Sequence, residues 1–598
     1  MAAAHPKGPT LWDKTYARFI SMSRRLTDHQ LMMVLACVVG VCAALSAYLL
    51  EALLHYIKAG LVSWFPDSEM GFLYLFYPII GIIIASLFVK YIVRDDISEG
   101  VTRVLESMSS HNSRLRRHNM WTSVVGSGIT IGFGGSVGPE APIVLTGGAI
   151  GSNVGRFARL NYKQTTLLLC CGAGAAVAAI FKAPVAGIVF VLEILMFDLT
   201  SNTIIPLLLA TVSATTLSFF LRGFDTVLAV NLTETFELRT IPMYVVLGIM
   251  CGLASYYFTS VKEWIGRFFG KFDKQYKKWI AGGVILGVLI FLFPTLYGEG
   301  YESFTSLMHG RTDNLLDTSP FYPWRDKAWV IALVLLATMM FKVVATMTTT
   351  ASGGIGGTFA PCLFVGAYMG ALIAFSCNNF LGMDLPIMSF TLVGMAGVMA
   401  GVMNAPLTGI FLIAELSGGY GLFIPLMIVS AVSYVIDYYL DPDSIYTKQL
   451  RERGLLLTHD KDSSVMVFLH VDELMETDFL QINTSYTLGD IVKIVQKGRR
   501  NIFPVVDDNE KLLGVVQLDD IRNDMFNPSK YDTRITEYMT QPPDRILPNE
   551  QTASVLKSFE ANSTWMLPVV DKHGRYMGFI SKSRILAAYR QQLVNITQ

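Results

Sequence analysis

The sequence predicts an all-α polytopic membrane domain, built from two repeats with short broken helices, followed by a cytosolic α/β domain. Of the 598 residues, 52% are hydrophobic and only 16% are charged, against about 25% charged in soluble proteins. Between Trp121 and Ser218, 7 of 98 residues are charged, whereas 32 of the 128 residues from Val471 to Gln598 are charged. This contrast predicts an apolar body with a soluble tail.

The predicted parts follow in order along the chain. Residues before Leu31 are polar and carry five Lys or Arg, a basic flank that predicts a cytoplasmic N-terminus before the first span. Several later apolar runs fall short of the roughly 20 residues of a straight spanning helix. We predict a cytosolic segment at residues 1–28, a transmembrane domain at 29–450 and a linker at 451–470, followed by two soluble repeats at 471–528 and 534–598. The C-terminus is expected in the cytoplasm as well.

The apolar body carries an internal duplication. The segment that begins Ala183-Pro184 reaches Glu193 with the same spacing by which the segment beginning Ala405-Pro406 reaches Glu415, at an offset of 222. A second pair of Ala-Pro segments, at Pro142 and Pro361, is offset by 219. Short interrupted helices at matching places in two halves are typical of transporters with a site at the membrane midplane. The pattern leaves open whether the repeats are parallel or inverted.

The soluble tail contains a second duplication. The segment from Phe503 to Asp507 and the segment from Leu567 to Asp571 share the pattern Pro-Val-Val-Asp at an offset of 64. Each unit predicts a helix, a strand, a hairpin, a second strand and a helix.

The four prolines Pro142, Pro184, Pro361 and Pro406 are each expected to open a helix, since proline is favoured at the first helical position. A helix N-terminus carries partial positive charge and free N–H groups. N-termini that converge inside a membrane therefore form an anion site without a fixed cation, and ordinary turns between spans are the alternative.

These motifs resemble those of the CLC chloride channel and proton–chloride antiporter family. Gly138-Pro139-Glu140-Ala141-Pro142 is similar to its Gly-Lys/Arg-Glu-Gly-Pro motif, and Gly357-Thr358-Phe359-Ala360-Pro361 to its Gly-x-Phe-x-Pro motif. The segment Asp443-Ser444-Ile445-Tyr446 resembles the one that bears its pore tyrosine. The soluble tail resembles the tandem cystathionine-β-synthase (CBS) pair of some family members.

The resemblance implies a role for each matching residue. Glu140 would be the external gate, whose carboxylate occupies the anion path and leaves it when protonated. The amides of Thr358 and Phe359 and the phenol of Tyr446 would contact the central anion. Gly138 and Ala141, which flank Glu140, are further anion-binding candidates.

Two positions depart from the family pattern. The spacing of the first family motif selects the segment from Ser98 to Thr102, so that Glu99 stands where the family has an anion-contacting serine. Ser127 lies in a similar motif but is too close to Glu140. The alternative for Glu99 is a solvated position at a membrane edge.

The second departure concerns proton transfer. Glu193 matches a family glutamate, but the following position, where antiporters carry the inner proton-transfer glutamate, is Ile194. We therefore expect a channel or a weakly coupled exchanger, with Glu193 as a possible substitute on the proton path. Its repeat partner Glu415 is expected to be structural.

The CBS repeats keep only part of the family's nucleotide-binding pattern. The ligand candidates are Gln517 and Asp520 in the first repeat and Ser581 and Arg584 in the second. Adenine-nucleotide binding is thus possible, while dimerisation and gating are expected first.

The function that follows is chloride transport by a homodimeric protein of the cell membrane, plasma or inner, gated by a glutamate and regulated by its CBS domains. The alternatives are a proton-coupled chloride or fluoride antiporter and, in a different class, a CBS-bearing divalent-cation transporter. The sequence shows no enzyme motif, no metal-ligand spacing and, with a formal net charge of zero, no sign of a nucleic-acid partner.

Overall fold

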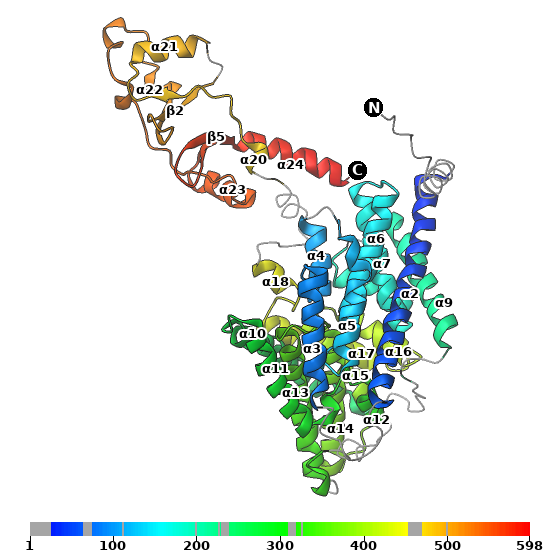
Figure 1. Ribbon diagram of the computed structural model, residues 1–598. Helices are drawn as coiled ribbons and strands as arrows, with labels where there is room; N and C mark the ends of the chain where they lie inside the picture. The colour runs from blue at the N-terminus through cyan, green and yellow to red at the C-terminus, as the bar shows by residue number, and fades with distance from the viewer. Residues whose placement is uncertain are drawn as a thin grey trace, which may run out of the picture. The chain divides into compact units, whose positions relative to one another are not determined.

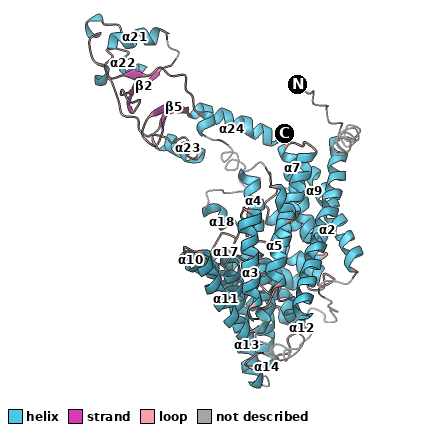
Figure 2. Ribbon diagram, in the orientation of Figure 1, coloured by secondary structure: helices cyan, strands magenta, loops and turns pink. Residues whose placement is uncertain are grey.

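The computed structural model describes residues 26–63, 75–110, 113–197, 200–224, 228, 238–308, 319–324, 327–452, 469, 471–497 and 500–597. Most of the predicted N-terminal segment 1–28 and of the predicted linker 451–470 lies outside these residues. The chain divides into two compact units, Met1–Gly454 and Leu455–Gln598. Figure 2 shows helices through the described part of the first unit, whereas the strands β1 to β5 belong to the second.

The first unit is a bundle of apolar helices (Figure 1). Within the described residues, eight helices are long and apolar enough to cross a membrane, and shorter apolar helices lie between them. The α-helices are α2 (Asp28–Ser63), α3 (Tyr77–Phe88), α4 (Gly100–Ser110), α5 (Thr122–Gly132), α6 (Glu140–Phe157), α7 (Tyr162–Phe181), α8 (Pro184–Glu193), α9 (Ser201–Arg222), α10 (Ile241–Gly270), α11 (Gln275–Leu292), α12 (Tyr301–Met308), α13 (Ala328–Ala351), α14 (Phe359–Leu381), α15 (Ile387–Met403), α16 (Pro406–Leu416), α17 (Phe423–Leu440) and α18 (Thr447–Glu452).

The predicted duplication is visible in the packing. Helix α6 packs on α7, α7 on α9 and α9 on α2; in the second half α14 packs on α15, α15 on α17 and α17 on α10. Helices α8 and α16 lie against each other, and the last residue of α8 contacts the first turn of α16, while Glu415 near the end of α16 contacts the first turn of α8. The two helices therefore run antiparallel, so the repeats are inverted.

Each repeat breaks its helices in the same way. Helix α7 is followed by Lys182, which adopts a left-handed conformation (φ 55°), and α15 is followed by Asn404, also left-handed (φ 51°). In both cases Ala-Pro follows, and the proline becomes the first residue of the next helix. A left-handed residue at the C-terminus stops the hydrogen-bond ladder, and the following proline cannot rejoin it.

Glycines allow the paired helices of each repeat to come very close. A Cβ on Gly147 of α6 would lie 2.2 Å from the carbonyl oxygen of Gly172 in α7, and a Cβ on Gly366 of α14 would lie 2.3 Å from the carbonyl oxygen of Gly394 in α15. Small residues at helix crossings are the usual means of tight packing in membranes.

The second unit contains two small α/β repeats. Its elements are α20 (Val471–Leu474), β1 (Ile482–Asn483), α21 (Leu488–Lys497), β2 (Ile502–Val506), β3 (Leu512–Gln517), α22 (Leu518–Ile521), α23 (Thr552–Ala561), β4 (Met566–Val570), β5 (Tyr576–Ser581) and α24 (Lys582–Thr597). β2 pairs antiparallel with β3 and β4 with β5, with a register shift at the equivalent places, Val505/Val506 and Val569/Val570. The predicted strand–hairpin–strand pattern is therefore present in both repeats.

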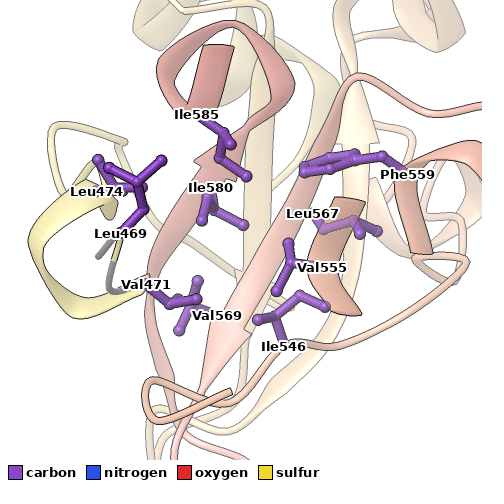
Figure 3. Close-up of a cluster of buried hydrophobic side chains, with 10 residues drawn as sticks. All are labelled: Leu469, Val471, Leu474, Ile546, Val555, Phe559, Leu567, Val569, Ile580 and Ile585. Atoms are coloured by element: carbon purple, nitrogen blue, oxygen red, sulfur yellow. The ribbon is translucent and has the colours of Figure 1, made fainter. Parts of the chain in front are cut away.

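Three apolar clusters hold this unit together. One is centred on Val555, Leu567 and Ile580 of the second repeat and also includes Val471 and Leu474 of α20 (Figure 3). An equivalent cluster surrounds Ile491, Phe503 and Val516 in the first repeat. A third cluster contains side chains of both repeats, among them Val515 and Phe579, and the backbone also pairs across at Lys511 and Arg575. The two repeats thus form a single compact pair.

Candidate functional site

The two glycine-rich loops of the predicted anion site pair with each other. The N–H of Gly138 donates to the carbonyl oxygen of Gly357 (2.9 Å), and the N–H of Gly357 donates back to Gly138 (2.7 Å). These residues occupy equivalent positions in the inverted repeats. Because each loop leads directly into a helix, the pairing holds the N-termini of α6 and α14 side by side.

Glu140 is the first residue of α6 and is buried, with 1% of its surface exposed. Its Oε1 accepts a hydrogen bond from the hydroxyl of Tyr301 (2.7 Å), and its Oε2 accepts one from the backbone N–H of Ala360 (3.3 Å). Ala360 lies in the first turn of α14. The carboxylate of one repeat therefore occupies the helix N-terminus of the other, where free N–H groups favour an anion.

Tyr301 was not found by sequence reasoning. It is the first residue of α12 and follows a tight turn in which Gly298 (φ 68°) and Gly300 (φ 93°) both have positive φ. The sequence signal that was available is this Gly-Glu-Gly-Tyr turn at the start of a helix. The turn orients the phenol toward Glu140, and the ring packs edge-on against Phe304 at 5.2 Å between centroids.

A cavity of about 480 Å³ lies beside the paired loops. It brings together four of the predicted residues, Glu99, Ala141, Thr358 and Tyr446. Of the described residues that line it, none is Gly138, Glu140 or Phe359. Glu140 instead lies against Ala360, and the Phe359 ring is buried against Phe181 at 5.4 Å.

Tyr446 is buried with its side chain against this cavity. Its hydroxyl lies 3.9 Å from the sulfur of Met403 and interacts with the side chain of Thr358. The phenol and the start of α14 thus face the same space, as a shared anion contact requires.

Glu99 lines the same cavity, directly before the first residue of α4. Its Oε1 accepts a hydrogen bond from Gln449 Nε2 (2.5 Å), and Gln449 accepts one from Thr102 (2.9 Å). A Cβ on Gly100 would lie 2.1 Å from the carbonyl oxygen of Ala141, so α4 begins against the backbone of α6. Ser127 is buried inside α5, where its hydroxyl donates to the carbonyl oxygen of Ser123 (2.7 Å).

Cationic side chains also line the cavity: Lys262, Arg267 and Lys448. Lys448 forms ion pairs with Glu263 and with Asp441. Mixed charges of this kind offer a polar approach to the half-buried Thr358 and the buried Tyr446.

Glu193 and Glu415 form reciprocal helix caps. Glu193 accepts hydrogen bonds from the backbone N–H groups of Leu407 (2.9 Å) and Thr408 (2.7 Å), and also from the Thr408 hydroxyl. Glu415 accepts them from the N–H groups of Val185 (3.2 Å) and Ala186 (2.9 Å). Ile194, the next residue after Glu193, is buried. Through these contacts, Glu193 caps the N-terminus of α16, a helix of the opposite repeat.

The CBS candidates occupy equivalent ends of β3 and β5. The backbone N–H of Gln517 donates to Asp520 (3.0 Å), and the hydroxyl of Ser581 accepts from the N–H of Arg584 (3.2 Å) while it donates to Glu476 (2.7 Å). Asp520 and Ser581 are therefore engaged in local contacts at the starts of α22 and α24.

The fold and the site define a polytopic membrane protein with two inverted repeats, in which helix N-termini from both repeats meet around a buried carboxylate. The chain belongs to the voltage gated chloride channel family, whose model matches residues 80–438, and two CBS domains match residues 471–527 and 535–591. This family comprises channels and transporters rather than catalytic enzymes, and the match favours anion transport over the divalent-cation alternative.

Individual relatives agree with this assignment. A ClcB-like protein of Ralstonia nicotianae is 29% identical over 386 residues, 63% of this chain and 85% of that protein. The H(+)/Cl(-) exchange transporter ClcA of Vibrio cholerae is 25% identical over 430 residues, 70% of this chain and 88% of that protein. The crystal structure of a slow cyanobacterial Cl−/H+ antiporter has the same fold, with a TM-score of 0.60, 23% identity, and coverage of 72% of this chain and 99% of that one.

Proposed function

We propose that this chain carries chloride or a similar small anion across a bilayer and that the Glu140 carboxylate is its gate. The observation that supports this most directly is the contact between Glu140 and the Ala360 N–H. A negatively charged side chain there competes with a permeating anion for the donors of α14. Protonation removes that charge, so the anion path opens.

We propose a channel-like or weakly proton-coupled mode for the wild-type protein, because Ile194 cannot carry a proton. The ClcA exchange transporter and the cyanobacterial antiporter support the alternative, a proton-coupled antiporter of chloride or of fluoride, whereas the ClcB-like relative is named a chloride channel protein. Glu99 lines the same cavity as Tyr446 and is a further candidate contact of the anion at the central site.

Further parts of the proposal concern assembly and regulation. The protein would act as a homodimer in the cell membrane, with both termini in the cytoplasm. The CBS pair would adjust the rate of transport, and Gln517, Asp520, Ser581 and Arg584 are the candidates for an adenine nucleotide.

The test is Glu140→Gln in proteoliposomes, with chloride and proton movement recorded together. The neutral side chain imitates the protonated gate, so flux at neutral pH should rise and most of the pH dependence should disappear. Glu302→Gln, which neutralises an exposed carboxylate one residue after Tyr301, is the matched control and should keep the wild-type profile. A wild-type pH profile in Glu140→Gln would show that Glu140 is not the gate.

A further inference from the structure

Lys342 lies in the middle of α13 and is completely buried. A charged side chain inside a membrane domain is costly, and residues of this kind usually serve a function. None of the transport steps proposed above uses it, and its contacts identify what it does.

The Lys342 ammonium group joins two loops that are distant in sequence. Its Nζ donates to the hydroxyl of Ser136 (2.9 Å) and to the carbonyl oxygen of Gly298 (2.8 Å), and it lies 4.8 Å from the centre of the Phe364 ring. Two hydrogen bonds and an aromatic face are together a full set of partners for an ammonium group.

Both loops lead to the gate. Ser136 precedes Gly138 and Glu140 in the loop that opens α6, and Gly298 begins the turn that ends at Tyr301. The loops also touch directly, since the N–H of Gly298 donates to the carbonyl oxygen of Gly134 (3.0 Å). Lys342 therefore bridges the loop that carries the gate and the loop that carries its hydroxyl partner.

We propose that Lys342 is a positioning residue of the gate, which holds the Tyr301 hydroxyl against the Glu140 carboxylate by bridging Ser136 and Gly298. The proposal rests on the proposed role of Glu140. According to this proposal, Lys342 holds the two loops in a fixed arrangement, and this arrangement maintains the hydrogen bond between Tyr301 and Glu140.

Other charged groups face Lys342 and Glu140, and the test leaves them unchanged. Glu299, between the two glycines of the turn, faces both Lys342 and Glu140, and beyond it lie Lys58 and Glu51 of α2 and Glu302 of α12. A change in the pH response that is caused by removing Lys342 must therefore be distinguished from the effect of altering the net charge around the gate.

The experiment compares chloride flux at about pH 4.5 with flux at about pH 7.5, because buried carboxyl groups titrate above the ordinary glutamate value of about 4.3. Lys342→Met keeps the length of the side chain but removes its charge and its hydrogen-bond donors. Lys342→Arg keeps the charge and the donors. Tyr301→Phe removes the hydroxyl partner. We expect Tyr301→Phe and Lys342→Met each to lower the ratio of the two fluxes by up to about tenfold.

The double variant decides whether the two residues act together. If Lys342 acts through Tyr301, the double variant should show the ratio of Tyr301→Phe alone, and Lys342→Arg should recover most of the wild-type ratio. In a Glu140→Gln background, Lys342→Met should leave the ratio unchanged. Lys327→Met, at the exposed start of the same helix, controls for the loss of a lysine.

Three results would overturn the proposal: a wild-type ratio in Lys342→Met, multiplied effects in the double variant, or equal loss of flux at both pH values. If Lys342→Met does not fold, Ser136→Ala removes one of the two acceptors with a small change in volume. It should lower the ratio at least about twofold, and an unchanged ratio would also overturn the proposal. A Glu140→Gln protein with the wild-type pH response would instead refute the gate itself.

Discussion

Tyr301→Phe tests how firmly the gate is held closed. The substitution removes the hydroxyl group and keeps the ring that packs on Phe304. Glu140 then retains backbone donors, among them the N–H of Ala360 at 3.3 Å. A hydrogen bond to a charged group contributes roughly 1.5–3 kcal/mol, which corresponds to a factor of about 10 to 150 in the ratio of closed to open gates. Because other donors compensate in part, we expect the lower value.

The assay is chloride efflux from proteoliposomes at several pH values, with Glu140→Ala as the upper limit. Tyr301→Phe should raise flux at neutral pH up to about tenfold, because the carboxylate leaves the anion path more often. At acidic pH, where the gate is already protonated, the variant and the wild type should agree. Equal flux at neutral pH, or a uniform decrease at all pH values, would refute the reasoning.

Three further predictions follow from other contacts. Glu193→Gln and Glu415→Gln should each lower the free energy of unfolding by about 1–2 kcal/mol, because each weakens a helix cap. Neither should change the ratio of protons to chloride transported. Loss of proton flux in Glu193→Gln at wild-type stability would show that Glu193 lies on the proton path. Glu99→Gln should raise the apparent chloride affinity several-fold, roughly what one like charge removed from a polar cavity allows, and stoichiometric proton pumping that this change abolishes would contradict the weakly coupled mode. In the CBS pair, Arg500 donates to Asp478 and holds the pKa of that carboxyl below its usual value, so this pair stabilises the fold at neutral pH and the stabilisation is lost as pH falls below about 4. Arg500→Met should therefore flatten the acid side of the thermal unfolding profile of the full chain.

The proline and glycine signals predicted much of the architecture. Pro184 and Pro406 are the first residues of α8 and α16, as expected, whereas Pro142 and Pro361 are the third residues of α6 and α14. The orientation of the repeats could not be predicted, because an offset of 222 residues says nothing about direction in the membrane. It required the contacts between α8 and α16.

The site was predicted in part. Glu140 was expected at a helix N-terminus, but the sequence does not say that the nearest free donor belongs to the opposite repeat. The backbone amide of Phe359, not its side chain, was expected at the central anion. Its ring packs on Phe181, and the role of the amide stays a prediction.

The connection of Lys342 to Tyr301 and the gate could not be predicted from the sequence. Lys342 is a single lysine in a long apolar run, and its acceptors are 206 and 44 positions away. No local pattern connects residues so far apart, and only tertiary packing brings them to one point.

The exchange of caps between Glu193 and Glu415 affects how the chain can be synthesised and assembled. Glu193 leaves the ribosome 215 residues before Thr408, whose N–H donates to it. The first turn of α8 is likewise synthesised long before Glu415, the carboxylate that caps it. During that interval the first half has a bare helix end and an unpaired acid, both costly to bury. The first half can therefore complete its final packing only when the second half arrives.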